Sequence, residues 1–134
     1  MATSNLCLIA QALRSNRLPV LVPKLNAAEY NCWGYTMFFL LPTRKPKWVD
    51  VYPMDLFLEY NTQLVRKPRA GDILVCRDPE DQSLSHTAIV VEPKSKKFCH
   101  KPGLCDLEIA SLAEIKETYD NPVCSYRRFK PRKA

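Results

Sequence analysis

The stretch NCWGYTMFFLLP, residues 31–42, decides the fold that the sequence predicts. Residues from Cys32 to Leu41 are almost all apolar, so a helix here would be hydrophobic on every side and buried in the core. Asn31 is a preferred residue for capping a helix N-terminus, and Pro42 would end the segment because proline breaks a helix interior. We therefore predict a buried helix capped by Asn31, and a buried strand is the alternative.

Helical patterns also lie on either side of this segment. Ser4 can cap a first helix that reaches Arg14, and residues 1–29 would form this helix and a following loop. On the C-terminal side a short helix is predicted from Pro53 to Tyr60, since proline is favoured in the first turn of a helix. The N-terminal half of the chain is therefore expected to be mainly helical.

After Pro68 the pattern changes to the short β-branched and aromatic runs that are typical of strands. These runs predict strands around 73–75 and at 87–91, 97–100, 107–109 and 123–129. Ser111, with Glu114 three residues later, predicts a last helix that begins with a capping box. No helix separates the first four predicted strands, as parallel pairing would require. We therefore expect an α+β fold with N-terminal helices packed on an antiparallel sheet of about five strands.

The composition is that of one soluble globular domain. The chain has 134 residues, of which 46% are hydrophobic and 25% charged, close to the averages for such proteins. No repeat, linker or low-complexity block divides it, so residues 1–134 are expected to form a single domain. The longest apolar run, Met37 to Leu41, is too short to span a membrane, and residues 1–16 lack the pattern of a secretory signal. We therefore expect a protein that is cytoplasmic as synthesised.

Positive charge is concentrated at the C-terminus. The formal net charge is +6, and the segment 127–134 contains five basic and no acidic residues, so the rest of the chain is nearly neutral. A basic tail of this kind is usually a solvated chain end, which is the expectation here. An anionic partner such as nucleic acid, phospholipid or an acidic cell-wall polymer is the alternative.

Cysteine and histidine are the residues that could carry chemistry. The chain has six cysteines and two histidines. The cysteines are Cys7, Cys32, Cys76, Cys99, Cys105 and Cys124. Without a secretory signal they are expected to be reduced thiols rather than a disulfide framework. A zinc site built from Cys99, His100 and Cys105 would lack the Cys-x₂-Cys spacing typical of such sites, so neither a metal nor another cofactor is predicted.

Cys32 is the cysteine placed best for reactivity. At the first turn of the predicted helix, free backbone N–H groups and the helix dipole would favour the thiolate by lowering the pKa of the thiol. His86, at the start of strand 87–91, could act as the base, and His100, at the end of the next strand, could orient His86. Adjacent strands lie about 4.8 Å apart, so the two imidazoles could touch. The structural alternative is a buried core thiol with two structural histidines.

Five segments follow one another in an order that is typical of a known family. They are NCWGY (31–35), RAGDIL (69–74), SHTAIVV (85–91), FCHKP (98–102) and EIASL (108–112). Together they resemble the NlpC/P60 superfamily of papain-like cysteine peptidases. The resemblance implies a papain-like NlpC/P60 fold in which Cys32 is the nucleophile, His86 the base and His100 the orienting residue. Four residues beside this set are candidate substrate contacts: Trp33, Gly34, Tyr35 and Ser85.

The resemblance also implies a reaction class. It implies hydrolysis of an amide bond, foremost in peptidoglycan peptides. The family usually has Asp-Cys-Ser-Gly where this chain has Asn-Cys-Trp-Gly at 31–34, so a large ring stands beside the nucleophile. The related CHAP amidases have a similar Gly-Asp strand and histidine segment, so the choice between endopeptidase and amidase stays open. An intracellular or host protein, or an ester, is a further alternative substrate.

The expected partners follow from these alternatives. If peptidoglycan is the substrate, a chain without a signal would be an effector exported by a dedicated secretion system, and the producing cell would hold a neutralising immunity protein. An alternative from another class is a non-catalytic basic module that binds nucleic acid through its tail. The sequence disfavours this module because no basic face interleaved with aromatic residues and no known nucleic-acid motif is present.

Overall fold

The structure is a computed structural model that describes residues 29–40, 47–102, 105 and 107–130. The described helices are α2 (Cys32–Leu40), α3 (Val51–Asn61) and α4 (Leu112–Thr118). The described strands are β1 (Thr62–Val65), β2 (Ile73–Arg77), β3 (Leu84–Glu92), β4 (Lys97–His100), β5 (Glu108–Ser111) and β6 (Val123–Phe129). The helix predicted between Ser4 and Arg14, and the end of the basic tail, lie outside the described residues.

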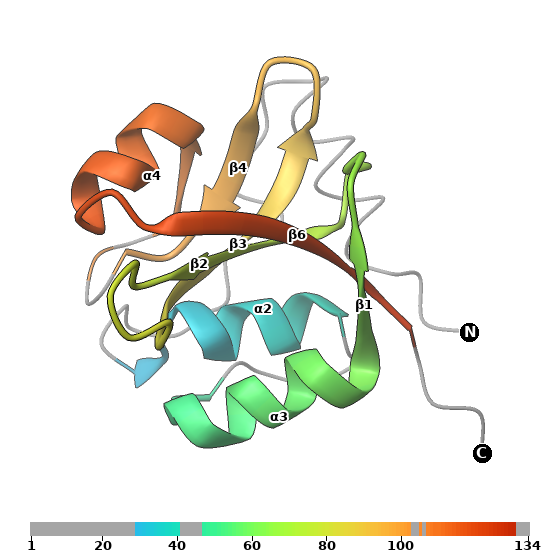
Figure 1. The fold of residues 1–134 in the computed structure, drawn as a ribbon, viewed down its shortest axis with the longest axis vertical. Coiled ribbons are helices and arrows are strands. Elements are labelled where there is room, and N and C mark those ends of the chain that lie inside the picture. Colours follow the sequence, from blue (N-terminus) through green and yellow to red (C-terminus); the bar gives the residue numbers. More distant parts are fainter. Residues whose placement is uncertain (1–28, 41–46, 103–104, 106, 131–134) are drawn as a thin grey trace.

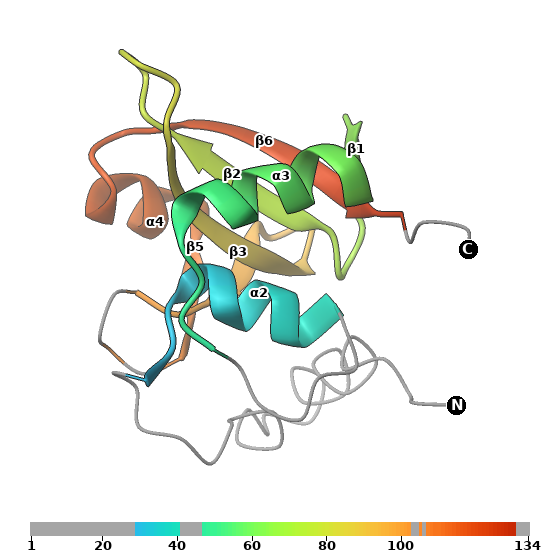
Figure 2. The same ribbon diagram turned by 90° about the horizontal axis from the view of Figure 1, so that it is seen from below.

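The strands form one antiparallel sheet in the order β1-β6-β2-β3-β4-β5. α2 and α3 lie side by side against one face of the sheet, and α4 lies against the other face (Figure 1 and Figure 2). The α+β class is confirmed, but the sheet in the described part of the chain has six strands rather than about five. Among the helices that the structure describes, none has the length and hydrophobicity needed to cross a membrane.

β1 is the strand that the sequence prediction missed. It follows α3 directly, so no turn residue marks its start. The two middle residues of this four-residue strand are both exposed, so the alternation of buried and exposed positions that identifies a strand is absent. β1 is held as the edge of the sheet by its pairing with β6, a segment far away in the sequence.

α2 forms where the buried helix was predicted, and Asn31 caps it. The side-chain Oδ1 of Asn31 accepts the N–H of Gly34 at 2.9 Å, and its backbone oxygen accepts the N–H of Tyr35 at 2.9 Å. The same side chain bonds both the N–H and the carbonyl of Val49. It thereby holds the chain before α3 against the first turn of α2.

Gly34 is required where this chain segment crosses α2. A Cβ added at position 34 would lie 1.6 Å from the backbone oxygen of Lys47, far inside van der Waals contact. Only glycine allows the backbone of Lys47 to approach the helix so closely. The glycine therefore has a packing role.

Two apolar cores lie on opposite faces of the sheet. The larger joins α2 and α3 to alternate strand residues such as Ile89. The smaller joins α4 to the intervening residues, such as Ala88. Because successive side chains of a strand point to opposite faces, Thr87 faces α2 and the neighbouring His86 faces the side of α4.

The remaining element boundaries agree with the predictions or differ by a few residues. β4 and β6 have the predicted bounds, and Ser111 and Glu114 form the predicted capping box of α4. β3 begins at Leu84 rather than at 87, because a bulge in its pairing with β2 lets the strand continue past His86. α3 begins at Val51, two residues before the predicted start.

The prediction of a basic tail from residue 127 is wrong for its first three residues, because Arg127, Arg128 and Phe129 belong to β6. Arg127 Nε donates to Thr62 Oγ1 at 2.7 Å, which ties β6 to β1. Arg128 forms an ion pair with the nearly buried Asp72, with 2.8 Å between its NH2 atom and Oδ2. Both arginine side chains therefore bond to residues of the fold. Because successive strand residues point to opposite faces, Arg127 and Arg128 lie on opposite faces of the sheet.

Candidate active site

Two contacts hold α2 against the sheet beside the histidines. Thr36 Oγ1 and Thr87 Oγ1 are 2.8 Å apart in a hydrogen bond, and Thr36 also donates to the backbone oxygen of Cys32 at 3.0 Å. Tyr35 OH lies 3.5 Å from Cys99 Sγ. Thr87 follows one histidine in the sequence and Cys99 precedes the other. These contacts therefore position the first turn of α2 near both.

The thiol of Cys32 lies where β4 ends. The backbone N–H of Val90 donates to the backbone oxygen of Asp72, on the β2 side of β3. Backbone groups of successive strand residues point to alternate neighbours, so even-numbered residues of β3 bond toward β2 and odd-numbered ones point toward β4. The N–H of Thr87 accordingly points to the β4 side, where β4 has ended at His100. The half-buried Cys32 thiol accepts this N–H in place of a further strand residue.

Burial raises the pKa of the Cys32 thiol from 9.0 to about 11. The N–H groups of Thr87, Trp33 and Cys32 itself, and the positive charge of Lys101, all lower this pKa. The expectation that the helix N-terminus would give a thiolate is therefore wrong for the resting protein. The donors are present, but the loss of hydration destabilises the thiolate more than the donors stabilise it.

The two histidines are in contact, as the predicted hairpin allows. The pairing of Ile89 with Cys99 places His100 diagonally across from His86 on the sheet. His86 Nε2 and His100 Nδ1 share a hydrogen bond of 2.9 Å, and the ring planes meet at 82°. Tyr119, just after α4, stacks on His86 with ring centroids 3.9 Å apart. His86 is thereby fully buried.

Both imidazoles are neutral at neutral pH. Burial lowers the pKa of His86 well below 6.5, and the charge of His100 acts in the same direction. Burial also lowers the pKa of His100, although its hydrogen bond with Glu108 opposes this shift. Among the residues that the structure describes, Nδ1 of His86 has no hydrogen-bond partner. The Cys32 thiol is hydrogen-bonded to the backbone N–H of Thr87 and not to Nδ1 of His86.

Glu108 is a site residue that the sequence analysis missed. His100 Nε2 lies 2.9 Å from Glu108 Oε1, and the two residues are directly opposite each other on β4 and β5. The side chain of Glu108 is 56% exposed and that of His100 only 1%, so the contact connects the buried rings to the surface. Only the position of Glu108 directly across from His100 could have indicated its role. That position depends on the register between β4 and β5, which the sequence does not reveal.

The four candidate substrate contacts have different environments. Tyr35 is 1% exposed and packs in the larger core, and Gly34 lies beneath the backbone of Lys47, which corrects the prediction that these two residues face a substrate. Ser85 is half-buried and donates to the backbone oxygen of Cys76 at 3.0 Å. Trp33 is half-buried, and its indole N–H has no hydrogen-bond partner in the described part of the protein.

The five cysteines within the described ranges are free thiols. Cys76 on β2 and Cys124 on β6 are paired residues with 3.8 Å between their sulfur atoms. Donation by the Cys76 thiol lowers the pKa of Cys124 to about 7 and raises the pKa of Cys76 itself. Among the described side chains, no three His, Cys, Asp or Glu residues gather as potential ligands of a metal ion.

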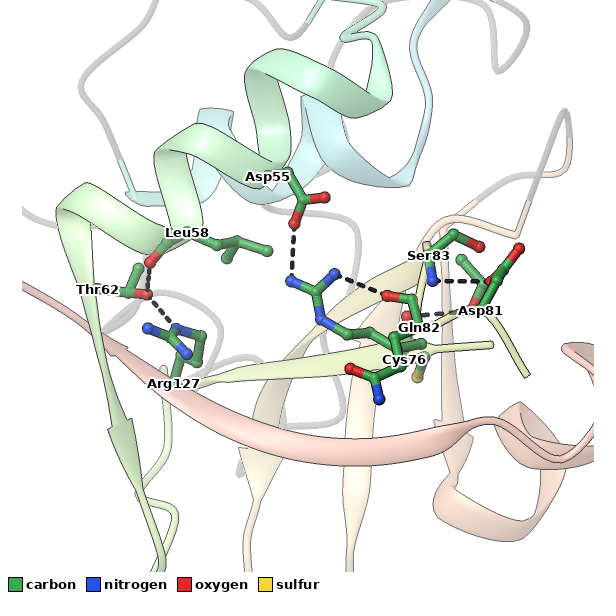
Figure 3. Close-up of polar contacts among 10 residues, drawn as sticks. Asp55, Leu58, Thr62, Cys76, Asp81, Gln82, Ser83 and Arg127 are labelled. Atoms are coloured by element: carbon green, nitrogen blue, oxygen red, sulfur yellow. Dashed lines mark hydrogen bonds and ion pairs between the residues drawn. The ribbon is translucent and has the colours of Figure 1, made fainter. Parts of the chain in front are cut away.

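A cavity of about 190 Å³ lies elsewhere, beneath α3. Its lining residues are Asp55, Leu58, Glu59, Arg77 and Arg127. Arg77 forms an ion pair with Asp55, with 2.7 Å between nitrogen and oxygen. Figure 3 shows Arg127 turned toward Thr62, to which it donates a hydrogen bond. Both arginines are thus bonded to neighbouring side chains, and none of Cys32, His86, His100 and Glu108 lines this cavity.

Cys32, His86, His100 and Glu108 together supply a sulfur, a neutral base and a chain of hydrogen bonds behind the base. These are the components of thiol-dependent nucleophilic catalysis. In comparisons with known proteins, no family model matches this chain, and no curated protein or solved structure is significantly similar to it.

Proposed function

We propose that this chain is a cysteine hydrolase with an NlpC/P60 type of fold, which cleaves an amide bond through an acyl-enzyme on Cys32. One observation carries the proposal. His86 is a buried, neutral imidazole that is bonded to His100 through Nε2 and has an unpaired Nδ1, beside the residue whose N–H bonds the Cys32 thiol. Burying an unpaired polar group costs about 1–3 kcal/mol, so chemistry explains this nitrogen better than stability does.

In this mechanism the thiol keeps its proton until substrate binds, because burial raises the pKa of Cys32 to about 11. The sulfur turns from the N–H of Thr87 toward His86, and His86 Nδ1 takes the proton as the sulfur attacks the substrate carbonyl. The N–H groups of Cys32 and Trp33 lie close to the sulfur and are donors for the oxyanion that forms.

The second half of the reaction uses the same groups. The protonated His86 returns its proton to the leaving amine as the carbon–nitrogen bond breaks, which leaves a thioester on Cys32. His86 then takes a proton from water, and the resulting attack on the thioester releases the acid and restores the thiol. His100 bonds the ring nitrogen of His86 that does not exchange protons, so it holds the base in place throughout.

The substrate class in this proposal comes from the sequence resemblance: an amide in peptidoglycan peptides, cleaved as an endopeptidase or an amidase. The half-buried Trp33 adjoins the nucleophile and is the side chain best placed to contact a bound peptide. For peptidoglycan outside the producing cell, the proposal includes export by a dedicated secretion system and a neutralising immunity protein.

The test compares the full chain with Cys32→Ala and with Cys105→Ala, a matched variant that removes an exposed cysteine. Each protein is incubated with isolated peptidoglycan under reducing conditions, and mass spectrometry identifies the soluble fragments. We expect fragments from the wild type and from Cys105→Ala, and none from Cys32→Ala. New peptide amino termini would indicate an endopeptidase, and sugars freed of their peptides would indicate an amidase.

Two negative results have different meanings. If the wild type releases nothing from peptidoglycan but hydrolyses model peptides or esters in a Cys32-dependent way, the peptidoglycan assignment is wrong and the hydrolase stands. If the wild type and Cys32→Ala behave alike with every substrate, the proposed function is wrong.

A further inference from the structure

The hydrogen bonds behind His86 determine which ring nitrogens carry protons. A carboxylate accepts hydrogen bonds and donates none, so the His100 Nε2 atom that lies 2.9 Å from Glu108 Oε1 must carry a hydrogen. A neutral imidazole has one N–H, and His100 Nδ1 is therefore an acceptor. His86 Nε2, 2.9 Å from this acceptor, must then be the donor, which leaves His86 Nδ1 without a hydrogen.

We propose that Glu108 is a positioning residue that holds both histidines in the Nε2–H tautomer and so keeps the lone pair of His86 Nδ1 available for the proton of the Cys32 thiol. Glu108 touches neither the sulfur nor a substrate and acts only through His100. Its part in catalysis rests on the proposed hydrolase function, whereas the placement of the protons follows from the two hydrogen bonds and the neutral state of the rings.

Other charged groups near the two rings do not replace Glu108. Glu114 of α4 acts on His100 through its charge, but its carboxylate bonds the N–H of Ser111. Tyr119 covers His86 by stacking, and Cys76 of β2 is its cross-strand neighbour. Among the described residues, Glu108 is the carboxylate that hydrogen-bonds an imidazole, so it alone gives the chain of hydrogen bonds its direction.

Substitution of the exposed Glu108 can weaken or reverse the donor-to-acceptor direction of the hydrogen bonds that join it to His100 and His86. In Glu108→Gln the side chain keeps its shape but can either accept or donate, so both tautomers become accessible. In Glu108→Lys the side chain can only donate, so His100 Nε2 becomes an acceptor, and each ring moves its hydrogen to Nδ1. The free lone pair of His86 Nδ1 is then lost. Glu117→Lys, at another exposed carboxylate, makes the same change in charge and is the matched control.

The direct measurement is ¹⁵N NMR of histidine-labelled, tag-free full chain at pH 7.5, in which two-bond couplings identify the protonated nitrogen of each ring. The chain has only two histidines, so the four ring signals can be assigned from single histidine variants. We expect Nε2–H in both rings of the wild type and of Glu117→Lys, a mixture in Glu108→Gln, and Nδ1–H in Glu108→Lys. Alkylation of Cys32 by iodoacetamide should slow at least about tenfold in Glu108→Lys, because the base has the wrong tautomer.

The proposal is overturned if wild-type His86 carries its hydrogen on Nδ1, or if both rings of folded Glu108→Lys remain Nε2–H. Circular dichroism confirms that each variant is folded. The spectra need no substrate, so this result is independent of the hydrolase assay. A protein that hydrolyses nothing but shows the expected tautomers refutes the proposed function, and a hydrolase with the opposite tautomers refutes the role of Glu108.

Discussion

The two halves of the sheet differ in how they accommodate polar side chains. In one half, formed by β1, β6 and β2 and here called the paired half because its charges form ion pairs, Arg128 lies 2.8 Å from Asp72 and Arg77 lies 2.7 Å from Asp55. In the histidine half, formed by β3, β4 and β5, His86 is buried without charge, and its Nδ1 has no partner in the described part of the chain. The first half satisfies its polar groups, and the second leaves one open.

Under the proposed function, this difference separates polar contacts that stabilise the fold from those that take part in the reaction. A partly exposed ion pair such as Arg77–Asp55 contributes little energy, about 0–1 kcal/mol, but it leaves neither charge without a partner. A buried nitrogen without a partner destabilises the fold, and such groups concentrate at sites where a ligand or reacting group completes them. The predictions below perturb the two halves in turn.

The largest effect is expected from His86→Ala in the histidine half. Loss of the base should lower kcat/KM by about 10²- to 10⁴-fold for whichever amide substrate the wild type cleaves. Steady-state kinetics measure the effect, and circular dichroism confirms that the variant is folded. Activity within a factor of two of the wild type would show that His86 is not the base.

The thiols of the two halves should differ in reactivity. Burial raises the pKa of Cys32 to about 11, while donation by Cys76 lowers the pKa of Cys124 to about 7. Because the weaker nucleophilicity of the more acidic thiol offsets part of this gap, iodoacetamide at pH 7.5 should modify Cys124 about 25- to 60-fold faster than Cys32. Peptide mapping by mass spectrometry gives both rates in one sample. Faster modification of Cys32 would mean that its resting state is a thiolate.

Gly34→Ala should disturb the packing beside the histidine half without changing any of the proposed catalytic side chains. The new Cβ would meet the backbone oxygen of Lys47, so the segment before α3 must move away from α2. We expect the free energy of unfolding to fall by roughly 3 kcal/mol, measured by urea denaturation. Glu117→Ala, on the exposed side of α4, is the control and should change it little. Equal midpoints for both variants would contradict the close approach.

The buried histidines should make the fold sensitive to acid. The folded-state pKa values of His86 and His100 lie below the ordinary 6.5, so below that pH the unfolded chain binds more protons than the folded chain. Stability is therefore highest above pH 6.5 and falls as the pH decreases toward the folded-state values. Urea midpoints at pH 8, 6 and 5 should decrease in that order. His86→Phe, which keeps a ring against Tyr119, should show a smaller decrease, and an unchanged decrease would assign the effect to other groups.

The smallest effect is expected in the paired half, from Arg127→Ala. Loss of its hydrogen bond to Thr62 loosens the edge strand β1 and should cost about 1 kcal/mol in the free energy of unfolding. The rate of Cys32 alkylation should not change, because the contact between β6 and β1 lies at one edge of the sheet and β4 lies near the opposite edge. A slower alkylation would mean that the two halves are coupled.

Most elements in the described residues could be predicted from the sequence because their signals are local. Asn31 caps α2 through the N–H of Gly34, and Ser111 and Glu114 cap each other at α4, in each case within three residues. β4 and β6 have their predicted bounds. β1 was missed because its pairing with β6 involves residues more than sixty positions away.

The candidate site was predictable only in part. Two histidines at the ends of neighbouring strands predicted the His86–His100 contact, since strand spacing is constant. Glu108 was missed because it meets His100 only through the register of β4 and β5. Tyr35 was predicted to contact a substrate because it is close in sequence to the proposed nucleophile Cys32, but its helical position turns it into the core.

By itself the sequence determined which segments become helices and strands and which side chains bring a sulfur and two imidazoles, because capping and periodicity act between near neighbours. Only the tertiary structure decided that the Cys32 thiol is protonated at rest, that His86 is neutral, and that a carboxylate bonds the second ring. Protonation depends on the loss of water and on partners supplied by several distant segments at once, and these are settled only when the sheet and helices have packed.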